Sequence, residues 1–173
     1  MRRFEYSDEL VTVVKQFLEE DGWRYTFDET TGIFQFNLRI RGKLQKINYV
    51  IDVHENKIIT YGFSLIAVDP KDAEAMTRMA EFICRVNYSM ENGCFEMDFT
   101  DGEVRFRTFI DCTGQVPSSE IIRNSLYCTA GMFGRYAEGF VDLVFGGASA
   151  AKAFEKCEQK KEERTKEESN LQE

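Results

Sequence analysis

Apolar residues recur along this chain with two different periods, and the period changes several times. Between residues 8 and 21 they follow helical spacing, and Ser7 precedes them as an N-cap residue, which predicts a first helix. From residue 23 to residue 68 the period is two, as is typical of strands with one buried face. Turns at 28–32, 42–43 and 55–57 divide this stretch, which therefore predicts an antiparallel meander.

The turn at 42–43 fixes the expected pairing of the two strands on either side of it. Counting outward gives the pairs Leu38 with Ile47, Phe36 with Tyr49, and Arg39 with Lys46. The first two pairs put apolar side chains on one shared face, whereas the third sets two positive charges opposite each other. We expect a nearby acidic side chain to relieve that repulsion. The next strand is expected to continue the buried face with Ile59, Tyr61, Phe63 and Leu65.

Two further helices and a hairpin complete the expected order. Asp69-Pro70 predicts the start of a second helix, which should end near Met90. A third helix is expected from Glu120 to Phe145. Because glycine is unfavourable inside a helix, its glycines predict either a break or kink near Ala130-Gly131 or close packing on the sheet. Between these helices, Asp101-Gly102 predicts a two-residue hairpin turn. That turn would pair Phe99 with Val104, Asp98 with Arg105 and Glu96 with Arg107.

The order helix, meander, helix, hairpin, helix indicates an α+β fold with an antiparallel sheet. Residues 1–147 are expected to form a single domain, because the apolar pattern is continuous over them. From residue 148 the composition shifts to Lys and Glu, and we expect residues 148–173 to form a charged tail that is either helical or disordered.

Charge and cysteine usage exclude several classes of function. The formal net charge is −8, which argues against nucleic-acid partners and against anionic membrane surfaces. The five cysteines are widely spaced, without a C-x-x-C pair, so neither a zinc site nor a disulfide framework is expected. The chain begins without the apolar run of a signal peptide and contains no membrane-length apolar stretch, which favours the cytoplasm.

No residue pattern in the chain predicts catalysis. The single histidine, His54, could be imagined as the base of a cysteine nucleophile, and Asp52, Asp98 and Asp111 as paired carboxylates, but no local motif supports either. We therefore expect no catalytic residue, no metal ligand, no cofactor and no enzymatic activity.

Basic side chains of the polar sheet face could form an anion site. These are Arg39, Arg41, Lys46, Arg105 and Arg107. The alternative is a solvated face with cross-strand pairing, because Glu96, Asp98 and Glu103 share it.

The chain resembles the YbjN family, whose members are candidate sensory-transduction regulators in bacteria. The resemblance rests on the alternating run 23–53, on AEFICRVNY (80–88) with the following hairpin, and on residues 124–147. It implies a fold like that of type III secretion chaperones: a curved antiparallel sheet with helices packed on one side. It also implies a non-enzymatic, protein-binding role, with a homodimer as one open alternative and the partner unidentified.

Two functions are therefore expected side by side. The first is a cytoplasmic protein-interaction module, either regulatory or chaperone-like, that binds another protein through the sheet or the final helix. The second is a small-molecule sensor with a pocket between helices and sheet, lined by Phe36, Tyr49, Tyr61 and Phe133.

Overall fold

The computed structural model describes residues 5–40, 43–88 and 90–170, with the backbone alone for 161–170. Its elements are α1 (Asp8–Glu20), β1 (Tyr25–Asp28), β2 (Ile33–Arg39), β3 (Lys46–Val53), β4 (Lys57–Ala67), α2 (Ala73–Asn87), β5 (Cys94–Met97), β6 (Glu103–Asp111), α3 (Ser119–Phe145) and α4 (Ala150–Asn170). The six strands form one antiparallel sheet in the order β1-β2-β3-β4-β6-β5. The α+β class and the element order expected from the sequence are confirmed, with α4 as a fourth helix.

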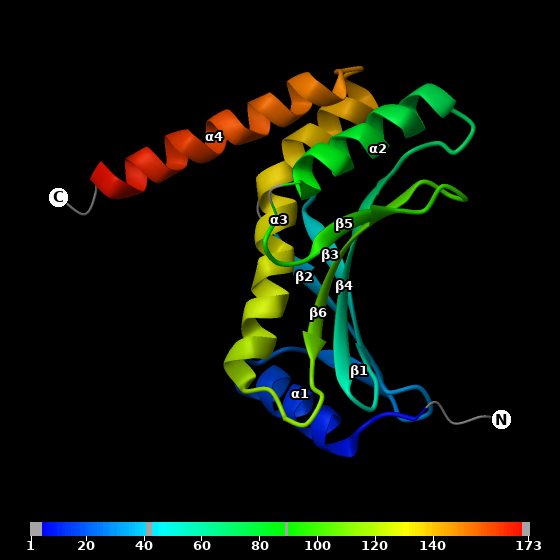
Figure 1. Ribbon diagram of the computed structural model, residues 1–173, viewed down its shortest axis with the longest axis vertical. Helices are drawn as coiled ribbons and strands as arrows, with labels where there is room; N and C mark the ends of the chain where they lie inside the picture. The colour runs from blue at the N-terminus through cyan, green and yellow to red at the C-terminus, as the bar shows by residue number, and fades with distance from the viewer. Residues whose placement is uncertain (1–4, 41–42, 89, 171–173) are drawn as a thin grey trace.

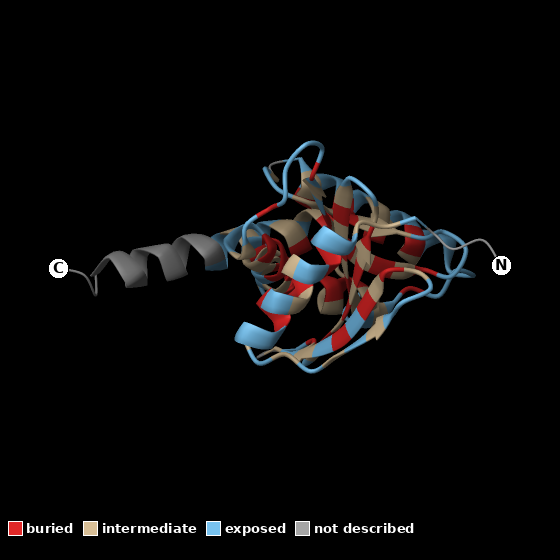
Figure 2. Cartoon of the chain, turned by 90° about the horizontal axis from the view of Figure 1, so that it is seen from below, coloured by how far each residue is buried: buried red, intermediate tan, exposed pale blue. Residues whose placement is uncertain are grey.

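The helices gather on one side of the sheet (Figure 1). The long helix α3 runs along the middle of that face, α1 lies at one end, and α2 and α4 pack together at the other. Side chains that point toward the helices are almost all buried, as in the alternating pattern of β3. Exposed and half-buried side chains alternate with them along the strands (Figure 2).

Small and hydroxylated side chains allow α3 to lie close to the sheet. Thr60, Thr108, Ser125 and Thr129 are buried between β4, β6 and α3, and Thr108 and Ser125 hydrogen-bond to each other. A Cβ added at Gly62 would lie 2.4 Å from Thr129 Cγ2, so any larger residue there would push the helix away. α3 is one continuous helix, so of the two alternatives expected for its glycines, the break near Ala130-Gly131 was wrong.

The meander register agrees with the sequence, but one strand presents its other face. β2 and β3 pair as expected, including Arg39 opposite Lys46. In β4, by contrast, Ile58, Thr60 and Gly62 point toward the helices, so the expectation that Ile59 and Tyr61 lie on the buried face was wrong. The physical reason is the close approach of α3, which excludes large side chains from the middle of β4.

The β5–β6 hairpin is longer at its tip than expected. Its register pairs Met97 with Val104 and Glu96 with Arg105, two residues away from the expected register. The Asp98 N–H donates to the Glu103 carbonyl, and the Gly102 N–H donates back to the Asp98 carbonyl at 2.8 Å. The turn therefore spans residues 98–102, and the expected pairing of Asp98 with Arg105 was wrong.

Helix boundaries follow local capping groups. The Ser7 hydroxyl accepts a hydrogen bond from the Leu10 N–H, as expected for the first helix. The second helix begins later than expected, because Asp72 rather than Asp69 is its N-cap and accepts from the Ala75 N–H at 2.9 Å. It also ends earlier, at Asn87.

The first part of α4 packs on the domain. Ala150, Ala153 and Cys157 are buried, and Glu158 accepts hydrogen bonds from Arg135 and from the Tyr136 hydroxyl, the latter at 2.9 Å. Residues 150–158 thus share the hydrophobic core of the preceding elements. The division at residue 147, expected from composition, stays a prediction.

Candidate functional site: the open face of the sheet

No helix of the described residues covers the second face of the sheet, which we call the open face (Figure 1). It is formed by the side chains of the six strands that point away from α3. On β2, β3, β6 and the part of β4 up to Phe63, these side chains are all half-buried or exposed. Because inward-pointing neighbours on the same strands are buried, this exposure reflects the absence of a covering layer and not a loose sheet.

An apolar band crosses the open face along β4. Ile59, Tyr61 and Phe63 follow one another on this strand, and the strand register places Val50 opposite Tyr61 and Phe109 opposite Ile59. Phe109 is 51% exposed and lies on β6 beyond the last residue that pairs with β5. Val50, Ile59, Tyr61 and Phe63 are half-buried, and the described helices leave the band uncovered, which makes it a candidate interaction surface.

Ion pairs border this band on the β5 side. Glu96 accepts from Arg105 at 2.8 Å and from Arg107 at 2.6 Å, and the Arg105 guanidinium lies 4.6 Å from the centre of the Tyr61 ring. Burial raises the pKa of Glu96, but the hydrogen bonds from Arg107 and Arg105 outweigh it and hold the pKa below its ordinary value. Arg105 and Arg107 are therefore both paired with Glu96. For these two residues this agrees with cross-strand pairing, the alternative to an anion site.

This ion triad predicts a pH-dependent stability. The folded-state pKa of Glu96 is lowered, so its contribution is complete above the ordinary value of 4.5 and is lost as the pH falls through the folded-state pKa. We expect Glu96→Gln to lower the free energy of unfolding by about 1 kcal/mol at pH 7, since the groups are partly exposed. Urea unfolding should show that the difference in free energy of unfolding between the variant and the original protein narrows as the pH is lowered past 4.5.

Glu55→Gln is the control, because Glu55 is an exposed turn residue. If the difference caused by Glu96→Gln were the same at all pH values, the stabilising role of the ionised Glu96 carboxylate would be contradicted.

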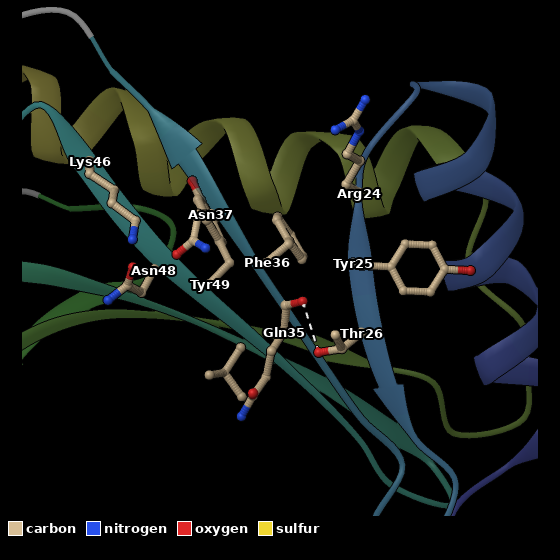
Figure 3. Close-up of a pocket in the computed structure, with 10 residues that line it drawn as sticks. Arg24, Tyr25, Thr26, Gln35, Phe36, Asn37, Lys46, Asn48 and Tyr49 are labelled. Carbon is tan, nitrogen blue, oxygen red and sulfur yellow. Dashed lines mark hydrogen bonds between the residues drawn. The ribbon is translucent and has the colours of Figure 1, made fainter.

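A pocket of about 610 Å³ lies at the other side of the open face and is lined by residues of β1, β2 and β3. It lies where β1 and β2 diverge beyond Phe36; we call it the β1–β2 notch, and Figure 3 shows it. Its polar side chains are Arg24, Thr26, Gln35, Asn37, Lys46 and Asn48. Phe36 and Tyr49 lie at its floor and stack with their ring centres 5.1 Å apart.

The four residues expected to line a ligand pocket are divided by the sheet. Phe36, Tyr49 and Phe133 are buried on the helix side, where the Tyr49 hydroxyl donates to the Leu126 carbonyl at 2.8 Å. Tyr61 lies on the open face. Of the four, the structure brings Phe36 and Tyr49 together at the notch; a ligand-binding role for the set stays a prediction.

The residues considered for catalysis are also placed. His54 Nε2 lies 3.1 Å from Asp52 Oδ2, in a geometry that does not make a hydrogen bond. Asp98 and Asp111 accept hydrogen bonds from the backbone N–H groups of Thr100 and Thr113 in turns. Within residues 5–40, 43–88 and 90–160, no group of three or more His, Cys, Asp or Glu side chains could hold a metal ion. All five cysteines are free thiols.

Sequence reasoning missed most of the open face, because it assigned β4 to the wrong side. Ile58 and Ile59 are adjacent apolar residues, so alternation alone does not decide which of them is buried. Gly62 carried the missing signal, since a glycine inside a strand indicates close approach of another element. Arg41, one of the considered anion-site residues, lies outside the described residues.

No helix of the described chain combines the length and hydropathy needed to cross a bilayer. Comparison with family models gives no match, and comparison with curated proteins gives none either.

Solved structures with a similar fold include YbjN from E. coli, described as a candidate transcription regulator, at 12% identity and a TM-score of 0.48, covering 70% of this chain and 86% of that one. A chain of the ExsC-ExsE complex is 12% identical with a TM-score of 0.46, covering 76% and 95%. A chain of the HopA1-SchA chaperone-effector complex is 14% identical with a TM-score of 0.46, covering 73% and 93%. The resemblance to YbjN and to chaperones that was expected from the sequence is thus found among solved structures.

Proposed function

We propose that this chain is a non-enzymatic protein-binding module of the cytoplasm, and that the open face is its binding surface. The observation that carries the proposal is the apolar band of Ile59, Tyr61, Phe63, Val50 and Phe109, over which the described part of the chain places no helix. Burial of such a band against another polypeptide is favourable at about 25 cal/mol per Å² of apolar surface. The five free thiols are in keeping with a reducing compartment.

The charged border of the band supports a polypeptide partner. Arg105 and Arg107 hold Glu96 at the edge of the band, so a partner that covers Tyr61 meets an ordered polar rim. An apolar centre with a polar rim is the usual arrangement of a protein–protein interface.

Site-directed photo-crosslinking in the host cell tests this proposal. A photoreactive phenylalanine at Phe109 is expected to form an adduct with one other polypeptide, while the same residue at Tyr127 is not. Tyr127 is the matched control, because it is an aromatic residue of α3 with 49% exposure on the helix side.

A second substitution makes the test specific for the band. Ile59 lies opposite Phe109, so Ile59→Glu should reduce the yield of the Phe109 adduct by about tenfold while circular dichroism stays unchanged. An adduct of twice the chain mass would identify the partner as a second copy. Equal adducts from both positions, or none from Phe109, would contradict the proposal.

A further inference from the structure

The basic residues of the polar sheet face fall into two groups. Arg105 and Arg107 are both paired with Glu96. Arg39 and Lys46 lie directly opposite each other, and neither forms an ion pair with a carboxylate of the described residues. The acid that the sequence led us to expect beside these two cations is therefore not seen in that part of the chain.

A third cation, Arg24, lies on the same face. The β1–β2 register, continued by one residue beyond its last pair, sets Arg24 opposite Asn37. Asn37 and Arg39 are neighbours on the open face, because residues two apart on a strand share a face and lie about 6.6 Å apart. Arg24, Asn37 and Lys46 line the notch together (Figure 3). In a protein of net charge −8, this local group of cations attracts an external anion.

The remaining polar groups of the notch suit the neutral part of a ligand. Gln35, Asn37 and Asn48 contribute amide side chains, and each amide can both donate and accept a hydrogen bond. The one hydrogen bond marked in Figure 3 joins the Thr26 hydroxyl to the Gln35 carbonyl, so these amides are not bonded to one another. Asn48 Oδ1 is buried and has no hydrogen-bond partner among the described residues. Hydroxyl groups, which also donate and accept, are the matching ligand groups.

The size of the notch and the placement of its cations favour one kind of anion. The volume of about 610 Å³ is in the range of small-molecule sites. A phosphate monoester carries a charge of about −1.5 to −2 at pH 7 and has three acceptor oxygens that point in different directions. Arg24 directly precedes β1, Arg39 lies in β2 and Lys46 in β3, so the cations approach from three neighbouring segments. A carboxylate has a single charge in one plane and matches this arrangement less well.

We propose that the β1–β2 notch binds a phosphorylated sugar, either free or as part of a nucleotide. Its phosphate group binds Arg24, Arg39 and Lys46, and its hydroxyl groups bond to the amides of Asn37 and Asn48. Of the residues in the apolar band, only Val50 lines the notch. The notch is therefore a second site, which does not depend on the proposed protein partner.

Isothermal titration calorimetry on the full chain tests this inference. The probes are ribose 5-phosphate, inorganic phosphate and ribose. We expect ribose 5-phosphate to bind at least about tenfold more tightly than either of the others, because it alone brings both the charge and the hydroxyl groups, and to bind more weakly in high salt. AMP, which contains the same phosphorylated ribose, distinguishes the sources: tighter binding than ribose 5-phosphate assigns a nucleotide, and weaker binding assigns a free sugar phosphate.

Charge removal locates the binding. Lys46→Gln and Arg39→Gln are each expected to weaken ribose 5-phosphate by about tenfold, whereas Lys71→Gln, at an exposed loop position, should change it by less than about twofold. Removing one of two like charges that lie opposite each other should not destabilise the sheet, so urea unfolding distinguishes lost binding from a lost fold. The inference would be overturned by inorganic phosphate that binds as tightly as ribose 5-phosphate, by an unchanged affinity in Lys46→Gln, or by no binding of ribose 5-phosphate.

Discussion

Replacing Phe95 by alanine is expected to lower the free energy of unfolding by about 3–5 kcal/mol, the largest effect of any single substitution considered. Phe95 is 2% exposed, and its ring makes edge contacts with Phe106, Phe133 and Phe140 at centre distances of 4.8–5.2 Å. It thereby joins the β5–β6 hairpin to α3, and its removal would leave a cavity at that junction.

The control for this experiment lies in the same hairpin. Phe99 is 65% exposed, so Phe99→Ala should change the free energy of unfolding by less than about 0.5 kcal/mol. Urea unfolding of both variants measures the difference. A comparable loss from the two substitutions would contradict the observed register, in which Phe99 lies in the turn and not on the floor of the core.

Gly102→Ala is expected to destabilise the protein by about 2–5 kcal/mol, for two reasons that add. Gly102 has φ +74°, a left-handed conformation that costs a residue with a Cβ about 1–2 kcal/mol. An added Cβ would also lie 1.9 Å from the Val68 carbonyl oxygen, and the displacement needed to relieve this adds about 1–3 kcal/mol. The Val68 N–H donates to the Gly102 carbonyl at 3.0 Å, so the hairpin tip and the end of β4 would separate.

A glycine without these restraints should respond in the opposite direction. Gly131 lies inside α3, and an added Cβ meets no atom within 4 Å, so Gly131→Ala should raise the free energy of unfolding by about 0.5–1 kcal/mol. Thermal unfolding of both variants gives the comparison. A loss at Gly131 equal to that at Gly102 would mean that steric contact is not the cause.

Periodicity was sufficient where the side chains of one face are uniformly apolar. The β2–β3 register followed from counting outward from the turn at 42–43, because Phe36, Leu38, Ile47 and Tyr49 leave a single pairing that buries them. The first helix likewise followed from Ser7 and its apolar stripe. In both regions, local sequence and tertiary packing favour the same conformation.

Periodicity failed where a neighbouring element decides which side chain fits. In β4 the apolar residues Ile59, Tyr61 and Phe63 point outward, because α3 occupies the space on the other side at Thr60 and Gly62. The hairpin register failed because Gly102 serves a longer turn that also contacts Val68. The apolar band of the open face could not be predicted from the sequence for the same reason. Without the packing of α3, an apolar residue that points outward cannot be distinguished from a core residue.

The hydroxyl groups beneath α3 restrict how that helix can move. A helix held on a sheet by aliphatic contacts alone can slide along its axis, since one aliphatic surface resembles another. Ser125 meets Thr108 and Thr60 across the interface, and the Tyr49 hydroxyl reaches the Leu126 carbonyl. An axial shift of one turn, about 5.4 Å, would leave these buried hydroxyls without hydrogen-bond partners, at a free-energy cost of about 1–3 kcal/mol each. α3 and the sheet should therefore move as one rigid unit, and a partner on the open face would meet a surface whose shape is already set before binding.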